Sequence, residues 1–288
     1  MRKISVIIPM YYEEEVVQEC YNKMTQVLSN IKDYEYEIIC VNDGSKDKTL
    51  SILEKIAEND KKVKVISFSR NFGHQCAVTA GLKYVTGDAV VIIDADLQDP
   101  PELIPDMLKL WEDGNEVIYG KRKTREGESK FKLLTAKMFY NTLNALSDVE
   151  IPKDTGDFRL LDRRCVNALK KLRESQRNTK SMFSWIGYNK KEVLYDRDPR
   201  VAGSTKWNYI KLMDLAIDGI TSFTTSPLRL STFIAIPTFI VLFVYFIYVI
   251  VKACVINEAI QAFQAIILLI LFFSGVQILL FGIIGEYL

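Results

Sequence analysis

"VVIIDADLQDPPE", residues 90–102, is the stretch that decides the fold and points to a ligand site. Its four consecutive β-branched residues predict a strand that is buried on both faces. Asp94 and Asp96 end this strand, and the amide of Gln98 follows them. Oxygen ligands at this spacing suit Mg²⁺ or Mn²⁺, which would complete its coordination shell with substrate phosphate oxygens. Asp99 precedes two prolines, and we expect it to cap the next helix.

Short apolar runs alternate with amphipathic segments along the first 120 residues. The predicted strands are 4–9, 37–43, 63–69, 88–96 and 116–120, and the predicted helices lie near 13–30, 47–59, 74–85 and 101–113. These repeats predict an α/β fold, a mostly parallel sheet with helices on both faces. Ligands of such sheets bind at the carboxyl ends of the strands. Neither G-x-G-x-x-G after the first strand nor a P-loop occurs, so the common nucleotide-binding motifs are not indicated.

Other polar residues fall on the same edge of the predicted sheet. Asp43 ends the second strand, where it could accept a hydrogen bond from a nucleobase or ribose, or simply form a turn. Lys121 and Arg122 follow the fifth strand and begin a basic run that also fits a solvated loop. His74, at a helix start, fits either a nucleotide contact or a surface position.

A mixed segment follows, with helices expected near 131–147 and 163–172 around "DTGDFRLLDR". Further along, "RVAGSTKW" supplies Arg200 and Lys206, which could bind a diphosphate or lie near anionic lipid heads. Residues 207–223 are apolar at helical spacing, which fits an interfacial helix or a plain core helix.

Charged residues almost vanish after Arg229. The runs 230–251 and 259–285 contain no charge, and each is long enough to cross the ~30 Å hydrocarbon core of a bilayer. Buried core helices are the alternative, although core helices of that length normally have a polar face. The short connector predicts an antiparallel hairpin, and the Lys and Arg residues before the first run predict a cytoplasmic N-terminal part.

The overall composition excludes some classes of function. The net charge of +1 gives no bias toward nucleic acid. The N-terminus does not resemble a signal peptide. The five cysteines have no metal-ligand spacing, so a reduced compartment is expected and neither disulfides nor zinc are indicated.

Seven motifs in order resemble one family. They are "IPMYYEEE", "VNDGSKDKT", "SRNFGHQCAVTAGL", "DADLQDPPE", "YGKR", "DTGDFRLLDR" and "RVAGSTKW", followed by the two apolar runs. The chain is similar over nearly its whole length to the polyprenyl-phosphate glycosyltransferases. These are inverting GT-A enzymes of family 2, related to dolichyl-phosphate mannose synthase and bactoprenol glucosyltransferases. Tyr12 departs from the family, which usually has Asn there. The family also continues with a polar tail beyond "GEYL", so a truncated chain is one interpretation.

The resemblance implies roles for single residues. Pro9, Tyr11, Glu13 and Asp43 would form the nucleoside pocket, and Asp94, Asp96 and Gln98 the metal and diphosphate site. Arg122, with Lys121 beside it, would contact the acceptor phosphate. Asp157 would be the catalytic carboxylate, acting with Asp96. Arg200 and Lys206 would contact the donor phosphates from a late loop.

The resemblance also implies an activity, the transfer of one sugar from a nucleotide donor to undecaprenyl or another polyprenyl phosphate with inversion. We expect a UDP-linked donor, UDP-glucose or UDP-GlcNAc, with Mg²⁺ or Mn²⁺ as cofactor. Because a phosphomonoester is largely a dianion at neutral pH, we expect Asp157 to orient substrate more than to remove a proton. A processive polysaccharide synthase is disfavoured by the missing Q-x-x-R-W motif. A catalytically silent scaffold is the other alternative, and the intact set of Asp94, Asp96, Asp157 and Arg200 disfavours it.

These inferences define an organisation. We expect a catalytic GT-A domain over 1–206, an interfacial region over 207–229 and a membrane hairpin over 230–288. The protein would lie in the cell membrane with its catalytic domain in the cytoplasm, and self-association stays open.

Overall fold

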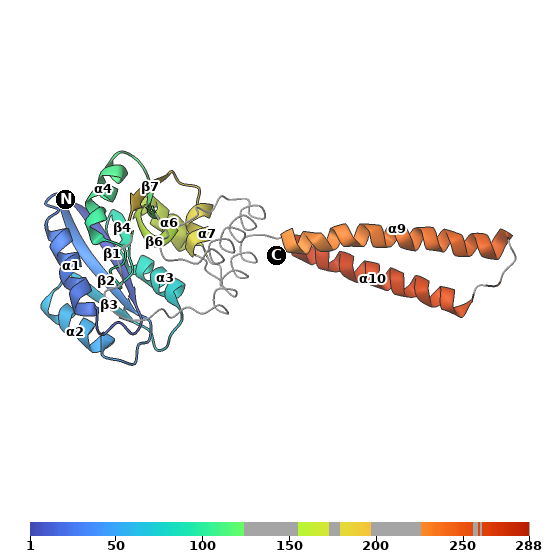
Figure 1. The fold of residues 1–288 in the computed structure, drawn as a ribbon, viewed down its shortest axis with the longest axis horizontal. Helices are drawn as coiled ribbons and strands as arrows, with labels where there is room; N and C mark the ends of the chain where they lie inside the picture. The colour runs from blue at the N-terminus through green and yellow to red at the C-terminus, as the bar shows by residue number, and fades with distance from the viewer. Residues whose placement is uncertain (124–154, 173–178, 197–225, 256–258, 260, 288) are drawn as a thin grey trace. The chain divides into compact units, whose positions relative to one another are not determined.

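A computed structural model describes most of the chain (Figure 1). The described residues are 1–123, 155–172, 179–196, 226–255, 259 and 261–287. They fall into two units, of which the first holds the described residues up to 196 and the second those from 226 onward. The helices expected near 131–147 and 207–223 lie outside the described residues, as does the expected boundary at 206. The boundary expected at 229 instead falls inside the helix that begins at Ser226.

The first unit alternates strands and helices, as predicted. Its elements are β1 (Arg2–Met10), α1 (Val17–Ser29), β2 (Tyr34–Asn42), α2 (Thr49–Asn59), β3 (Val63–Ser67), α3 (His74–Tyr84), β4 (Ala89–Ile92), the 3-10 turn η1 (Pro101–Leu103), α4 (Ile104–Glu112), β5 (Val117–Arg122), β6 (Thr155–Asp162), α6 (Arg163–Lys171), α7 (Thr179–Trp185) and β7 (Lys190–Tyr195).

The strands form one seven-stranded sheet with the order β3-β2-β1-β4-β6-β5-β7. Every pairing is parallel except those of β6, which runs antiparallel to both β4 and β5. In this register Arg159 of β6 lies opposite Ile92 of β4. Since β6 is reversed, its first residues reach the edge at which the parallel strands end. The sheet is therefore mostly parallel, as the sequence predicts, with one reversed strand that carries Asp157 to the ligand edge.

Helices cover both faces of this sheet (Figure 1). Successive side chains of a strand point to opposite faces. Val6 and Val91 belong to the main core cluster, which also contains Met24 of α1 and Met107 of α4. On the other face, Ile7 of β1 lies directly against α3, and α3 contacts α6. The central strands β1 and β4 are therefore buried on both sides, as the run of β-branched residues predicts.

The second unit consists of α9 (Ser226–Val255) and α10 (Ala262–Tyr287). Their contacts pair Gly282 with Thr232 and Gly275 with Phe239, so the two helices run antiparallel. The candidate membrane spans within them have 25 and 23 residues, with a mean hydropathy of 2.7 for each. Only 11% of each span is buried, which disfavours the alternative of soluble core helices. Both helices confirm the predicted apolar runs, with bounds that differ by a few residues.

Candidate active site

Acidic residues from two neighbouring strands meet at the carboxyl edge of the sheet. Asp94 and Asp96 follow β4, and Asp157 lies near the start of the reversed strand β6. His74, the first residue of α3, lies between them. Its Nε2 is 2.9 Å from Oδ1 of Asp94, and its Nδ1 is 3.8 Å from Oδ2 of Asp157. The structure thus joins the predicted diphosphate residue Asp94 to the predicted catalytic carboxylate through His74.

The placement of His74 goes beyond either sequence interpretation, a nucleotide contact or a surface position. The imidazole is one-third exposed and contacts both carboxylates from the N-terminus of α3. The preceding Gly73 has φ +96°, a backbone conformation that favours glycine and lets the chain turn sharply into the helix. The only sequence signal for a contact with both carboxylates was that the single histidine of the chain falls at the ligand edge of the predicted sheet.

Asp43 holds the loop that leads into α3. The carboxylate is 3% exposed, and it accepts hydrogen bonds from the backbone N–H of Phe72 at 2.7 Å and of Gly73 at 2.9 Å. The side chain of Asn71 donates a third, at 2.9 Å. Asp43 therefore fixes the segment that positions His74, and its predicted contact with a nucleoside stays a prediction.

The loop after β1 is tied to the start of α2. Pro9 is buried in β1 opposite Val41. The backbone N–H of Tyr12 donates to Oγ of Ser45 at 3.0 Å, and that of Glu13 donates to Oγ1 of Thr49 at 2.9 Å. These bonds place the predicted nucleoside residues on the ligand edge of the sheet.

Tyr11 and Tyr12 form an aromatic pair in this loop. Their ring centroids are 4.5 Å apart, in an edge-to-face arrangement. Tyr12 has φ +54°, the left-handed region that favours Asn and Gly. This conformation gives a physical reason for the Asn that the family usually has there.

Asp96 and Gln98 form a tight turn beyond β4. The backbone N–H of Gln98 donates to Oδ1 of Asp96 at 3.2 Å, and Leu97 between them has φ +57°. Among the described residues, no three His, Cys, Asp or Glu side chains gather as a metal site. Two half-buried carboxylates nevertheless fit a Mg²⁺-type cation, which commonly uses one or two protein carboxylates together with substrate phosphates.

The expected capping role of Asp99 is wrong. Pro100 occupies the cap position of η1, and no side chain caps that turn. The Asp99 carboxylate is instead 2% exposed, and it accepts a hydrogen bond from the hydroxyl of Tyr195 on β7. Burial and the charge of Asp99 together raise the pKa of Tyr195, so this phenol stays a donor. This hydrogen bond fixes the turn after β4 to β7, the edge strand of the sheet.

The structure separates the two basic residues predicted at the acceptor phosphate. The guanidinium of Arg122 lies beside Gly156 at the start of β6, and its charge acts to lower the pKa of Tyr195, against the larger effects of burial and Asp99. Lys121 points to the opposite face of the sheet, where its Nζ is 2.8 Å from Oε2 of Glu192. Arg122 is therefore brought to the site, whereas Lys121 is not. Arg200 and Lys206 lie outside the described residues.

Sequence reasoning missed Arg159. This residue follows Asp157 by two positions on β6, is 4% exposed, and donates to the backbone carbonyls of Gly156 and Asp157 at 3.0 and 3.3 Å. A charged side chain inside a strand, two residues after a candidate catalytic acid, was the available signal.

The first unit has an open, mostly parallel sheet with two carboxylates after its central strand, as the GT-A fold requires. Residues 5–170 match the family model described as "Glycosyl transferase family 2". The chain therefore belongs to glycosyl transferase family 2.

Two relatives are similar over almost the whole chain. An uncharacterized glycosyltransferase of Synechocystis sp., sll0501, is 44% identical over 99% of this chain and 90% of its own length. The bactoprenol glucosyl transferase of Shigella phage SfX is 41% identical over 99% of this chain and 93% of its own. The mannosyltransferase PcManGT from Pyrobaculum calidifontis, solved with GDP-Man and Mn²⁺, has a TM-score of 0.52 at 18% identity, covering 74% of this chain and 60% of that one. That likeness supports the fold.

Proposed function

We propose that this protein transfers one glucose from a nucleotide donor to a polyprenyl phosphate, with inversion at the anomeric carbon. The observation that carries the proposal is the meeting of Asp94, His74 and Asp157 at the ligand edge, in a chain that continues into two apolar helices. A relative named for glucosyl transfer to bactoprenol, similar over 99% of the chain, supports glucose and a lipid acceptor.

The donor site would lie between the loop after β1 and the turn after β4. We propose that Pro9, Tyr11 and Glu13 bind the nucleoside, assisted by Asp43 and the loop that it holds. UDP-glucose is the donor to test first, and UDP-GlcNAc is the alternative. We propose that Arg200 and Lys206, in the later loop, contact the donor phosphates.

Asp94 and Asp96, with Gln98 beside them, would hold Mg²⁺ or Mn²⁺. A bound divalent cation would offset the negative charge that builds on the leaving diphosphate. The Mn²⁺ in PcManGT is a property of that protein and supports the same chemistry here. Removal of divalent ions with EDTA should abolish turnover, and either ion should restore it.

The acceptor phosphate needs positioning more than activation. Its second pKa is near ~6, so at neutral pH it is largely a dianion that can attack without a strong base. Arg122 would hold this anion in line with the anomeric carbon, and Asp157 would orient the sugar or the acceptor. Turnover measured across pH tests this role. A rate that follows a carboxylate base, after phosphate ionisation is accounted for, would refute it.

The test of function is reconstitution. Purified protein is incubated with undecaprenyl phosphate, Mg²⁺ or Mn²⁺ and a panel of nucleotide sugars, and the lipid product is read by mass. We expect one hexose per lipid from UDP-glucose. A ladder of longer products would support a processive synthase, and no product from any donor would support a silent scaffold.

The site assignment needs matched variants. Asp96→Asn should lower turnover by about 10²-fold or more, since it removes charge at the proposed metal site. Asp106→Asn is the control, because Asp106 is an exposed α4 carboxylate paired only with Lys109 in the described part of the chain. Full metal-dependent activity in Asp96→Asn would refute the metal site.

A further inference from the structure

We propose that Arg159 is the positioning residue for Asp157. It would fix the backbone that carries this carboxylate and attract the negative charge of the carboxylate. The inference rests on the proposed function, because it takes Asp157 to act on the substrates. It adds a residue to which neither the motif pattern nor the similarity to relatives assigns a role.

Hydrogen bonds tie Arg159 to the backbone beside the carboxylate. Its Nη2 donates to the carbonyl of Gly156 at 3.0 Å, and its Nε donates to the carbonyl of Asp157 at 3.3 Å. Both carbonyls belong to the first three residues of β6, at the edge of the sheet where the substrates would bind. A planar guanidinium that holds two successive carbonyls restricts the rotation of the peptide units between them. The direction in which Asp157 leaves the strand is fixed in this way.

The charge of Arg159 also lies close to Asp157. Nη2 of Arg159 is 4.0 Å from Oδ1 of Asp157, which is too long for a hydrogen bond but close enough for strong attraction in a buried site. Oδ1 is buried and accepts no hydrogen bond in the described structure. The other oxygen, Oδ2, lies 3.8 Å from His74. Asp157 is thus set between a buried guanidinium and the imidazole that also contacts Asp94.

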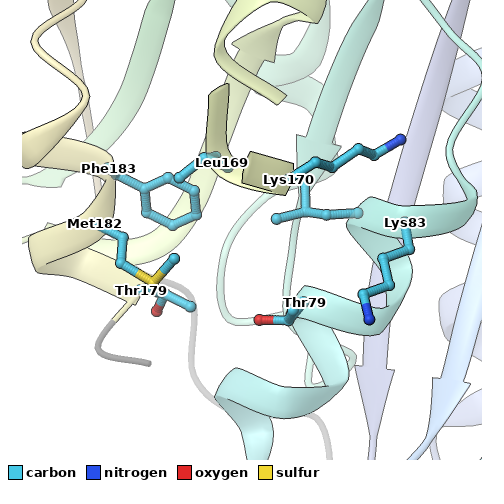
Figure 2. Close-up of a pocket in the computed structure, with 8 residues that line it drawn as sticks. Thr79, Lys83, Leu169, Lys170, Thr179, Met182 and Phe183 are labelled. Atoms are coloured by element: carbon cyan, nitrogen blue, oxygen red, sulfur yellow. The ribbon is translucent and has the colours of Figure 1, made fainter. Parts of the chain in front are cut away.

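Aromatic packing holds Arg159 in place. Its guanidinium carbon lies 4.0 Å from the ring centroid of Phe183 on α7, at cation–π distance. Burial lowers the pKa of Arg159 to about 10, against the opposing effect of the Asp157 charge, so the group stays protonated at neutral pH. Phe183 also borders a recess between α3, α6 and α7, where Figure 2 shows it beside Leu169 and Met182. Packing of α7 is therefore linked to Asp157 through Arg159.

Arg163 provides a matched comparison. It lies four positions further along, as the first residue of α6 directly after β6, and its guanidinium donates to the carbonyls of Val85 and Gly87. The chemistry is the same, a guanidinium on two backbone carbonyls, but the carbonyls lie away from the ligand edge. If the role of Arg159 were purely structural, replacing either arginine would lower turnover only through loss of folded protein.

The first experiment compares Arg159→Met with Arg163→Met in the full-length protein. We expect Arg159→Met to lower kcat by roughly 10- to 100-fold, the scale of a small misplacement of a catalytic group, with little change in KM for the nucleotide sugar. Arg163→Met should keep kcat within about twofold even if the two variants lose similar thermal stability. Equal loss of kcat in both variants would overturn the proposal.

Two further comparisons keep the proposal testable if Arg159→Met folds poorly. Arg159→Lys keeps the charge but not the planar fork, so kcat should fall less than in Arg159→Met. Phe183→Leu removes the ring and should lower kcat in the same direction by a smaller factor.

A double-variant cycle tests whether Arg159 acts through Asp157. In an Asp157→Asn background, Arg159→Met should cause no further loss of kcat, whereas independent roles would give multiplied losses and refute the coupling. Wild-type protein in the same assay distinguishes failure of the proposed function from failure of the proposed role of Arg159. If it makes no lipid product, the proposed function fails. If it is active and the two arginine variants behave alike, only the role of Arg159 fails.

Discussion

Glu37 and Asp94 are both acidic residues of the sheet, but their charges are offset in different ways. Glu37 is 1% exposed at the edge opposite the candidate site, where it accepts hydrogen bonds from Ser5, Thr86 and Lys64. The structure itself satisfies this carboxylate, whereas Asp94 is one-third exposed and contacts an imidazole. A carboxylate saturated by its own chain serves stability. One left facing the ligand edge is suited to a cation or substrate.

The Glu37 cluster predicts pH-dependent stability. Burial alone would raise the pKa of Glu37, but hydrogen bonds from Lys64, Ser5 and Thr86 hold it well below its usual range. A depressed pKa contributes stability above the unfolded value of about 4.3, and this contribution is lost as pH falls below it. Glu37→Gln should therefore cost about 2 kcal/mol at pH 7 and progressively less below pH 4. That cost is below the ~3–5 kcal/mol of a broken buried pair, since the lysines can reach water.

Thermal unfolding of the full chain in detergent, at pH 7 and again below pH 4, measures how the stability cost of Glu37→Gln changes with pH. Glu35→Gln is the control, because Glu35 lies on the same strand but is exposed, and it should change stability by less than about 0.5 kcal/mol. An undiminished effect of Glu37→Gln at low pH would contradict the charge argument.

Tyr12 is held in a conformation that its side chain disfavours. A residue other than glycine in the left-handed region costs on the order of 1 kcal/mol, and Asn tolerates it best. Tyr12→Asn should stabilise the protein by up to about 1 kcal/mol, seen as a higher melting temperature. Tyr12→Phe keeps the same backbone cost and should leave stability unchanged. A gain in both variants would point to loss of the Tyr12 hydroxyl rather than to the backbone, since Tyr12→Phe keeps the ring pair.

At the scale of elements, the regular repeats were readable and the reversed strand was not. β1 to β5 and the helices between them follow from apolar runs and helical spacing. β6 contains Asp157 and Arg159 in place of an apolar run, and β7 is a polar edge strand, so neither gave a strand signal. The partner of Asp99 is 96 residues away in sequence, which no local pattern can reveal. The carboxylates after β4 were found from sequence because strand and ligands are contiguous there.

The packing of α3 against β1 depends on Gly81. A Cβ added at Gly81 would lie 2.5 Å from Cγ2 of Ile7 and 3.2 Å from its Cγ1. Gly→Ala inside a helix normally stabilises by up to about 1 kcal/mol. Here Gly81→Ala should instead destabilise by about 1–3 kcal/mol, because overpacking pushes α3, which begins at His74, from the sheet.

A double-variant cycle with Ile7→Ala checks this contact by thermal unfolding. Removing the Ile7 side chain opens the space that the new methyl needs, so the double variant should be more stable than the summed losses predict. Strict additivity would mean that the two residues do not compete for space.

At the scale of the whole molecule, the two units expose different kinds of surface. The catalytic unit has buried apolar side chains and a polar surface, whereas α9 and α10 expose large apolar side chains along their length. The pairs Gly282–Thr232 and Gly275–Phe239 leave room for close helix contact, as is common between helices in membranes. A hairpin of two spans requires that its connector and the catalytic unit lie on opposite sides of the membrane.

The native cysteines test this topology. Cys76 of the catalytic unit and Cys254 at the end of α9 are exposed, whereas Cys20, Cys40 and Cys165 are buried. Burial raises the thiol pKa of these three, so they form little reactive thiolate. A membrane-impermeant thiol reagent should therefore modify only Cys76 and Cys254, and Cys254 should be reached because it lies one residue from the end of the first candidate span. If the catalytic unit is cytoplasmic, Cys254 should react in intact cells and Cys76 only after permeabilisation.

Cys76→Ser and Cys254→Ser, each leaving one exposed thiol, assign the labelled site by mass. The positive-inside distribution of Lys and Arg before the first span favours this orientation, because those charges resist transfer across the membrane. Labelling of Cys76 in intact cells, with Cys254 protected, would show that the topology is the reverse of the expected one. The nucleotide site would then lie away from cytoplasmic donors. Labelling of both in intact cells would contradict a two-span hairpin, since its ends and its connector cannot share one side.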